Sequence, residues 1–300
     1  EIIGGFKEML DHNIEDEKHK VEVTVPVIGK SAGILSFNDL KTGGYIKQRQ
    51  KDKFTVRCMV PGGRLPIKKL KKITEVAEKY GEEYVHLSFR QSLEIPYVDY
   101  HDFDKVVAEL AEVDQKVASC GPRVRVPTAC SGCEYNPNGL SDTQGLTKIV
   151  NDKFFGAECN HKFKTSFSGC PIDCARTSEM DLAFQGAVFP EWEKEKCTGC
   201  RICASACQED AIHDHPETGE PIFYPEKCLY CADCIRACPT EAWVSGKVGH
   251  IVRIGGKHGR HPFKGSVVAK FVSDEDVPAI IEKTVEWYNI HGKGKGRIRI

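Results

Sequence analysis

The order of apolar and polar residues predicts a strand and a helix near the start of the patterned region. FTVRCMV (54–60) alternates as a strand, and PGGR (61–64) follows it as a turn. Pro66 then opens a helix that Gly81 ends. The apolar residues of this helix recur every three or four positions and so share one face: Ile67, Leu70, Ile73, Val76, Ala77 and Tyr80.

Further elements follow in alternation. EYVHLSF (83–89) is predicted to be a strand, and RVRVP (123–127) another. Between them, Asp102 can cap a helix that carries Val106, Val107, Leu110, Val113 and Val117. Strand, helix, strand, helix, strand predicts an α+β sandwich of the ferredoxin-like kind.

The two ends of the chain differ in clarity. Residues 1–50 have little pattern, and their charged stretch DHNIEDEKHK (11–20) is interpreted as a solvated face. After residue 247, GHIVRIGG (249–256) and SVVAKFV (266–272) are predicted strands, and residues 275–290 a helix. The tail GKGKGRIRI (292–300) is basic and rich in glycine, with a possible short final strand.

Composition and charge narrow the function classes. The 300 residues are 40% hydrophobic and 28% charged, as in an ordinary globular protein, and the net charge of −1 argues against binding nucleic acid through phosphate contacts. No apolar run approaches the ~18 residues of a membrane-spanning helix, and no secretory signal is visible. We therefore expect a soluble cytoplasmic protein without a membrane or nucleic-acid partner.

The fifteen cysteines point to metal binding. Eight of them form two runs of CxxCxxCxxxC spacing, and Pro239 follows the second run. This is the spacing of bacterial two-cluster ferredoxins, in which the fourth cysteine of each run binds the other cluster. One [4Fe–4S] cluster should then take Cys197, Cys200, Cys203 and Cys238, and the other Cys207, Cys228, Cys231 and Cys234. Zinc is the alternative, and a disulfide framework fits the close spacings poorly.

Four more cysteines lie outside these runs. Cys130 and Cys133 stand in ACSGC, and Cys170 and Cys174 in GCPIDC, so two loops together offer four thiolates. That is enough for a third [4Fe–4S] cluster. Many thiols and only three methionines also suit an anaerobic setting.

From about residue 43 onward the chain resembles the sulfite and nitrite reductases that couple sirohaem to a [4Fe–4S] cluster. It is most similar to small members with an inserted ferredoxin domain, namely the C subunits of anaerobic sulfite reductases and dissimilatory-type proteins. The segments that carry the resemblance keep the family's order: GGYIKQRQKDKFTVRCMVPGGRLP, LSFRQSLEIP, RVRVPTACSGCEYNPNGLSDTQGL, KFKTSFSGCPIDCAR and VRIGGKHGRHP.

The resemblance implies a fold and a domain plan. The fold class is α+β: a sulfite-reductase half-fold, made of a ferredoxin-like sandwich and a sirohaem domain, with an inserted two-[4Fe–4S] ferredoxin domain. We expect an N-terminal segment (1–50), the ferredoxin-like domain (51–119), the sirohaem domain (120–190 and 247–300) and the insert (191–246). The implied cofactors are one sirohaem and three [4Fe–4S] clusters.

The resemblance also implies roles for single residues. Cys174 would bridge the cluster and the sirohaem iron. The carboxylates of sirohaem would be held by side chains in matching basic segments: Arg49, Arg57, Arg90, Gln91 and Arg260. Arg125, Lys162 and Lys164 would bind the anionic substrate and deliver protons, since alternation sends both lysines of KFK to one side. Each of these charges could instead be a plain solvated one.

Two departures from the family pattern bear on these roles. The family has five residues between its first two cluster cysteines. Counted from Cys130, the second cysteine would stand at position 136, where this chain has Asn136. Cys133 is the expected replacement and Cys159 the reserve. Met59 stands where the family has a substrate-binding arginine. Cys58, Cys120 and Cys159 have no assigned role.

The functional hypothesis is reduction of sulfite, or of a related small oxyanion, with electrons relayed through the insert. Nitrite reduction is one alternative, and a non-catalytic electron-transfer protein is the other. A protein must donate the electrons. Because the chain has one of the two related halves found in larger members, a homodimer or a heterodimer with a related subunit is expected.

Overall fold

The computed structural model describes residues 20–292 and forms two compact units. Within the described residues, the first unit comprises 20–128, 150–164 and 287–292, and the second comprises 129–149 and 165–286. The charged stretch at 11–19 and the tail after 292 lie outside the described residues, so the predictions made for them stay predictions.

The first unit is built on a four-stranded antiparallel sheet of order β3-β4-β6-β5. Its strands are β3 (Tyr45–Lys47), β4 (Lys53–Cys58), β5 (His86–Leu87) and β6 (Leu93–Asp99). In β4, Phe54, Val56 and Cys58 are fully buried and alternate with half-buried positions. Burying one such large apolar side chain contributes roughly 1.5–3 kcal/mol.

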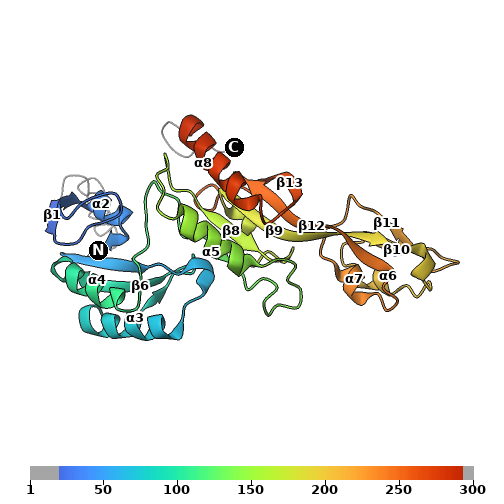
Figure 1. Cartoon of the computed structure of the whole chain (residues 1–300), viewed down its shortest axis with the longest axis horizontal. Helices are drawn as coiled ribbons and strands as arrows, with labels where there is room; N and C mark the ends of the chain where they lie inside the picture. The colour runs from blue at the N-terminus through green and yellow to red at the C-terminus, as the bar shows by residue number, and fades with distance from the viewer. Residues whose placement is uncertain (1–19, 293–300) are drawn as a thin grey trace, which may run out of the picture. The chain divides into compact units, whose positions relative to one another are not determined.

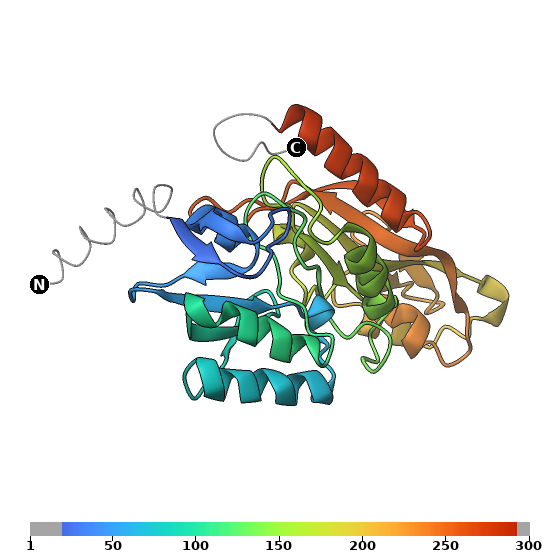
Figure 2. The ribbon, with the colours of Figure 1, turned by 60° about the vertical axis from the view of Figure 1, so that its left-hand side comes forward.

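Two helices, α3 (Ile67–Tyr80) and α4 (Phe103–Ala111), cover one face of this sheet (Figures 1 and 2). Pro66 and Gly81 flank α3, which confirms that prediction. Asp102 does precede α4, but its carboxylate binds Lys105 Nζ at 2.6 Å instead of a backbone N–H. The helix ends before Val113 and Val117, so that part of the prediction was wrong.

The second predicted strand was also wrong in extent. Only His86 and Leu87 of EYVHLSF pair, as an exposed edge strand, and the long partner of β4 is β6 instead. Its residues Leu93–Val98 are mostly buried in a row, which hides the alternation. The predicted strand RVRVP does not form a continuous strand. Two of its residues make isolated β-bridges, Arg123 with Glu158 and Val124 with Phe163.

Residues 20–50 contain structure that the sequence pattern did not indicate. The strands β1 (Lys20–Val23) and β2 (Gly33–Ser36) form a hairpin, and α2 (Phe37–Thr42) follows. Ser36 and Asp39 form a reciprocal cap at the start of α2, in which the Ser36 hydroxyl accepts from the Asp39 N–H and the carboxylate accepts from the Ser36 N–H. That S-x-x-D signal is readable in the sequence.

The second unit contains a five-stranded mixed sheet of order β13-β12-β9-β8-β7. Its strands are β7 (Thr128–Ala129), β8 (Thr165–Ser168), β9 (Leu182–Trp192), β12 (Trp243–Ile254) and β13 (Ser266–Val272). β8 and β9 run parallel, whereas β9, β12 and β13 are antiparallel neighbours. The predicted strands at 249–256 and 266–272 are therefore present. Helices α5 (Thr143–Phe154) and α8 (Val277–His291) each begin in this unit and end in the first.

Residues 193–242 lie between two directly paired residues, Trp192 at the end of β9 and Trp243 at the start of β12. Figure 1 shows β9 and β12 running together from the sheet into this segment. It contains α6 (Ile202–Ala206), β10 (Ile212–Asp214), β11 (Pro221–Phe223) and α7 (Asp233–Ala237). Cys203, Ile212, Cys234 and Trp243 form its small core. Short 3₁₀ turns elsewhere are Pro61–Gly63, Tyr100–Asp102, Thr177–Glu179 and Lys194–Lys196.

Candidate functional site

The Cys130–Cys133 loop is a tight turn in which a backbone N–H points to the sulfur of Cys130. Gly132 has φ +60°, and its N–H points to Cys130 Sγ at 3.4 Å. The N–H of Gly169 donates to the same sulfur at 3.1 Å. A Cβ on Gly132 would lie 2.6 Å from the Ser141 carbonyl oxygen, so a side chain does not fit. Two backbone N–H groups thus point to one sulfur of this loop.

The Cys170–Cys174 loop follows β8 and meets the first loop at a glycine pair. A Cβ on Gly169 would lie 2.9 Å from the Cα of Gly132, which keeps the two backbones in contact. Asp173 has φ +58° and accepts from the Ser168 hydroxyl at 2.8 Å and from the Thr177 N–H at 2.7 Å. The two loops that carry the four predicted ligands are thus adjacent in the second unit.

The cysteine loops at 197–203 and 228–234 repeat the same backbone geometry. Residues two and four after the first cysteine have positive φ in both: Gly199 and Arg201, then Tyr230 and Ala232. The N–H at the first of these positions points back to the sulfur, at 3.5 Å for Cys197 and 3.3 Å for Cys228. Gly132 has the equivalent place after Cys130. Three CxxC loops of the chain therefore form the same sulfur-centred turn.

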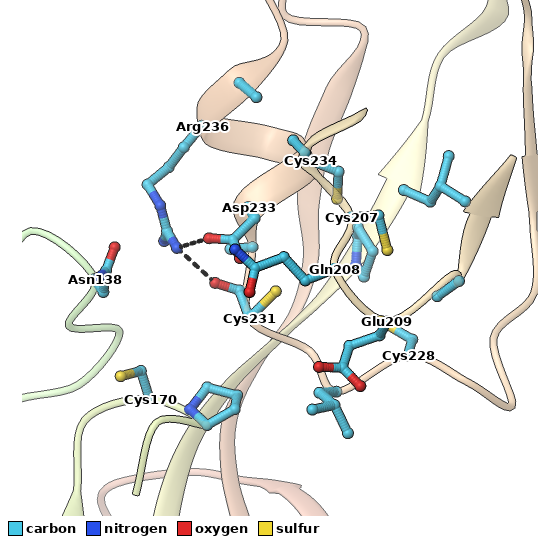
Figure 3. A pocket seen from close by; sticks show the side chains of 18 of the residues that line it. Asn138, Cys170, Cys207, Gln208, Glu209, Cys228, Cys231, Asp233, Cys234 and Arg236 are labelled. Atoms are coloured by element: carbon cyan, nitrogen blue, oxygen red, sulfur yellow. Dashed lines mark hydrogen bonds and ion pairs between the residues drawn. The ribbon is translucent and has the colours of Figure 1, made fainter. Parts of the chain in front are cut away.

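A cavity of about 630 Å³ in the second unit is lined by cysteines of the segment 193–242 and by a cysteine of the loop after β8 (Figure 3). Its lining includes Cys207, Cys228, Cys231 and Cys234, which are the four ligands expected for one ferredoxin cluster. Cys170 lines the same cavity from the other side. Arg236 borders it and donates to the Cys231 carbonyl at 2.9 Å and to the Asp233 carboxylate.

Two thiols in this cavity hold their protons more tightly than a free cysteine does. Burial, with nearby cysteine and aspartate groups, raises the pKa of Cys231 to about 11 and that of Cys234 to about 12. Metal binding would release these protons. Across residues 20–292 no three His, Cys, Asp or Glu side chains converge closely enough to bind a single metal ion. The donor chemistry, four sulfurs with backbone N–H groups at the loop cysteines, fits an iron–sulfur cluster.

The first unit contains a cluster of cationic side chains, in which Arg125 is buried and Arg57 and Arg90 are half-buried. Arg57 Nε and Nη2 both bind Glu94 Oε1 at 2.7 Å, and Glu94 Oε2 lies 2.8 Å from His86 Nδ1. Arg57 Nη1 and Arg125 Nη2 both donate to Cys120 Sγ, at 3.0 and 3.1 Å. Burial raises the pKa of the Cys120 thiol, but the charges of Arg125, Arg57 and Lys41 outweigh it, so its pKa is lowered.

A small pocket of about 10 Å³ opens beside this cluster. Arg57, Arg90 and Arg125 line it together with Ser119, whose buried hydroxyl has no hydrogen-bond partner among the described residues. Three guanidinium groups and a free hydroxyl give this space the chemistry of an anion site, and its volume suits about one water-sized group, such as a single oxygen atom of an anion.

The predicted substrate-binding cations lie on neighbouring segments. The Arg125 N–H donates to the Phe163 carbonyl at 2.9 Å, and Val124 pairs with Phe163 as parallel neighbours. Because Val124 and Phe163 are both buried, alternation sends Arg125 with Lys162 and Lys164 to the other side of the pair. Lys162 is exposed and Lys164 half-buried.

The other predicted contacts are dispersed. Arg49 is exposed ahead of β4. Gln91 has a φ of +61°, and its side chain lies beside Gly63. Arg260 belongs to the second unit, exposed between β12 and β13. Met59 follows β4 on the Arg57 side, with Asn151 Nδ2 3.8 Å from its sulfur. Cys159 is buried in the first unit, whereas Cys133 shares the second unit with Cys130.

Sequence reasoning missed three members of the cationic cluster: Glu94, Ser119 and Cys120. Glu94 had a readable signal, since an acid in the apolar run SLEIP must find a partner when buried. Ser119 and Cys120 are ordinary in sequence, and only the fold brings them to Arg57 and Arg125.

Comparison with known proteins matches both parts of the chain. A model of the nitrite and sulphite reductase 4Fe-4S domain matches residues 120–300, and one of the nitrite/sulfite reductase ferredoxin-like half domain matches residues 46–113. Fold and site thus define an iron–sulfur oxidoreductase. More particularly, the chain belongs to the nitrite and sulfite reductase family, which implies sirohaem and a [4Fe–4S] cluster.

Two relatives are similar over most of the chain. It is 33% identical over 258 residues to the coenzyme F420-dependent sulfite reductase of Methanocaldococcus jannaschii, covering 86% of this chain and 41% of that protein. It is 31% identical over 250 residues to the C subunit of the anaerobic sulfite reductase of Salmonella typhimurium, covering 77% of this chain and 73% of that one. The chain thus spans less than half of the methanogen protein.

Solved structures confirm the mixed α/β fold. The crystal structure of dissimilatory sulfite reductase I matches with a TM-score of 0.70 at 19% identity, covering 98% of this chain and 75% of that one. The Mycobacterium tuberculosis NirA protein matches with a TM-score of 0.62 at 15% identity, covering 87% and 42%. In the described part of the chain, every helix is too short or too polar to cross a membrane.

Proposed function

We propose that this chain is a sirohaem-dependent reductase that converts sulfite to sulfide. The observation that carries the proposal is the identity of its relatives. The two proteins that match at 33% and 31% identity over most of the chain are both named sulfite reductases. Nitrite reductases match less well, for example that of Bacillus subtilis at 28% over 177 residues.

In this proposal the cationic side chains divide the work. Sirohaem, when bound, supplies an iron that binds the sulfur of sulfite and passes electrons to it. Arg125, Lys162 and Lys164 would bind the anion's oxygens, and the two lysines would give up protons as water leaves. The sirohaem carboxylates would be held by Arg49, Arg57, Arg90, Gln91 and Arg260.

The cysteine loops would supply the electrons. Cys130, Cys133, Cys170 and Cys174 would hold the sirohaem-linked cluster, with Cys174 as the bridge to the sirohaem. Residues 191–246 would form the inserted domain with two further clusters. The shared cavity supports such a relay, since Cys170 and the four cysteines of one proposed cluster line it together. Conduction would then run from a protein donor through the insert to the loop of Cys170.

The partner proposal rests on the relatives. The Salmonella relative is a subunit by name, and the methanogen relative is longer than this chain. A homodimer, or a heterodimer with a related subunit, would supply the second half of the fold. The second candidate is a protein that transfers electrons but has lost catalysis. Met59 favours it, because this residue stands where the family has a substrate-binding arginine.

A visible spectrum and an iron count of the anaerobically purified protein test the proposal. We expect Soret and red bands of sirohaem, and about 13 iron atoms per chain from three clusters and one haem. Iron near eight with no tetrapyrrole extractable into acid acetone would leave a two-cluster ferredoxin. Turnover of sulfite against nitrite with one reductant then separates the two enzymatic functions.

A further inference from the structure

Cys120 accepts hydrogen bonds from two arginines of the cationic cluster. Its sulfur accepts from Arg57 Nη1 at 3.0 Å and from Arg125 Nη2 at 3.1 Å. Cys120 is 9% exposed and Arg125 7%, so the contact between them is shielded from water, whereas Arg57 is half-buried. Arg57 comes from β4 and Arg125 from the segment beside Phe163, so one sulfur joins two elements that are far apart in sequence.

The chemistry of the two donors defines the state of the sulfur. A guanidinium group has only N–H donors and no acceptor, so the sulfur must be the acceptor in both contacts. An acceptor of two charged hydrogen bonds is favoured as an anion. The lowered pKa of this thiol has the same cause, and Lys41 of α2 adds to it.

Charge balance points the same way. Glu94 offsets the charge of Arg57 by accepting from the Nε and Nη2 of that arginine. Arg125 and Arg57 would otherwise bring two like charges to one buried spot, which is unfavourable where water is excluded. A thiolate at Cys120 neutralises the remaining charge and leaves Arg90 as the further cation on the pocket.

We propose that Cys120 is a thiolate tie that holds Arg57 and Arg125 together, and thereby a positioning residue for anion binding in this reductase. The inference deepens the proposed function and rests on it for its link to sulfite. Without the tie, Arg125 would lose one of its fixed contacts and its aim at the anion. Cys58 offers a matched comparison, because it is also a buried thiol of this unit, but burial and Glu94 raise its pKa to about 12.

The first experiment measures the ionisation of Cys120 in the full wild-type protein. Alkylation by iodoacetamide is followed from pH 6 to 10 under anaerobic conditions, with the Cys120 peptide quantified by mass spectrometry. The same peptide in urea-unfolded protein is the reference. We expect the rate in the folded protein to level off at lower pH than in the unfolded chain, since only the thiolate reacts. A midpoint equal to or above the unfolded one overturns the tie.

The second experiment measures sulfite binding by the shift of the Soret band. Cys120→Ala and Cys120→Ser should each require about tenfold more sulfite, because a guanidinium group loses its anionic anchor. Cys120→Asp restores a negative charge and should stay within about threefold of wild type, as should the matched control Cys58→Ala. Unchanged titration by Cys120→Ala or Cys120→Ser overturns the positioning role.

The two experiments fail in different ways. A protein without sirohaem bands would refute the proposed function and with it the role in sulfite binding, while the alkylation midpoint would still decide the thiolate tie. A protein that binds sulfite normally in the Cys120 variants would refute the positioning role and leave the reductase intact. If Cys120→Ala does not fold, the serine and aspartate variants decide.

Discussion

The cysteine loops and the arginine cluster are built in opposite ways. The turns at Cys197 and Cys228 are completed within a few residues, by a positive-φ position and an N–H that points back to the sulfur, at Gly199 and Tyr230. The cationic cluster instead collects Arg57 from β4, Glu94 from β6, and Cys120 and Arg125 from the stretch that follows α4. Local chemistry is therefore robust to distant change, whereas the assembled cluster depends on the whole first unit.

The largest expected effect lies in the loops. Cys133→Ser should abolish the sirohaem-linked cluster and its EPR signal and remove about four iron atoms, because a thiolate ligand is lost. The two clusters of the insert should survive, since their loops are independent. Cys159→Ser is the control, and should change little because Cys159 is buried, its N–H donates to the Pro122 carbonyl, and it belongs to neither cysteine loop. An exchange of these two outcomes would assign the fourth ligand to Cys159.

The next effect tests the relay. Cys231→Ala should lower turnover with a protein donor at least about tenfold while sirohaem stays bound, because electrons must cross the cavity that Cys231 lines. Turnover is measured with the physiological donor and with a small artificial donor, which can bypass the insert. Equal turnover of variant and wild type with the protein donor would contradict the relay.

A smaller effect probes the arginine cluster. Met59→Arg should tighten sulfite binding up to about tenfold, because one more cation on the Arg57 side of β4 attracts the anion. Met59→Gln, of similar length and no charge, should leave the titration unchanged. If Met59→Arg has no effect while Lys162→Ala and Lys164→Ala abolish binding, Met59 does not face the substrate.

The smallest effect concerns backbone strain in one loop. Gly132→Ala should lower the free energy of unfolding by about 2 kcal/mol, since its φ of +60° and the Ser141 carbonyl oxygen both oppose a Cβ. Gly156→Ala is the control, because that glycine has a similar positive φ of +79°, yet its added Cβ would meet only the Ile28 side chain at 3.6 Å, an ordinary contact. Thermal unfolding of the iron-loaded protein measures both, and equal losses would remove the steric argument.

This contrast explains what the sequence could predict. The cysteine sets and the helix from Ile67 to Tyr80 depend on spacing within short windows, and spacing is visible in the sequence. The strand β6 was missed because residues 93–98 are buried on both faces and do not alternate. Cys120 was missed because its meaning comes from Arg57 and Arg125, which only the fold brings to it.

The pairing of Trp192 with Trp243 has a consequence for how this chain could have arisen. Fifty residues leave and re-enter the sheet at adjacent points, so their gain or loss does not separate β9 from β12. In genetic terms the segment is an exchangeable cassette, and a two-residue hairpin turn is long enough to close the gap that it leaves. If the segment relays electrons as proposed, a lineage could thus change its electron donor by replacing one continuous stretch of gene, while the loops of Cys130 and Cys170 and the arginine cluster stay as they are.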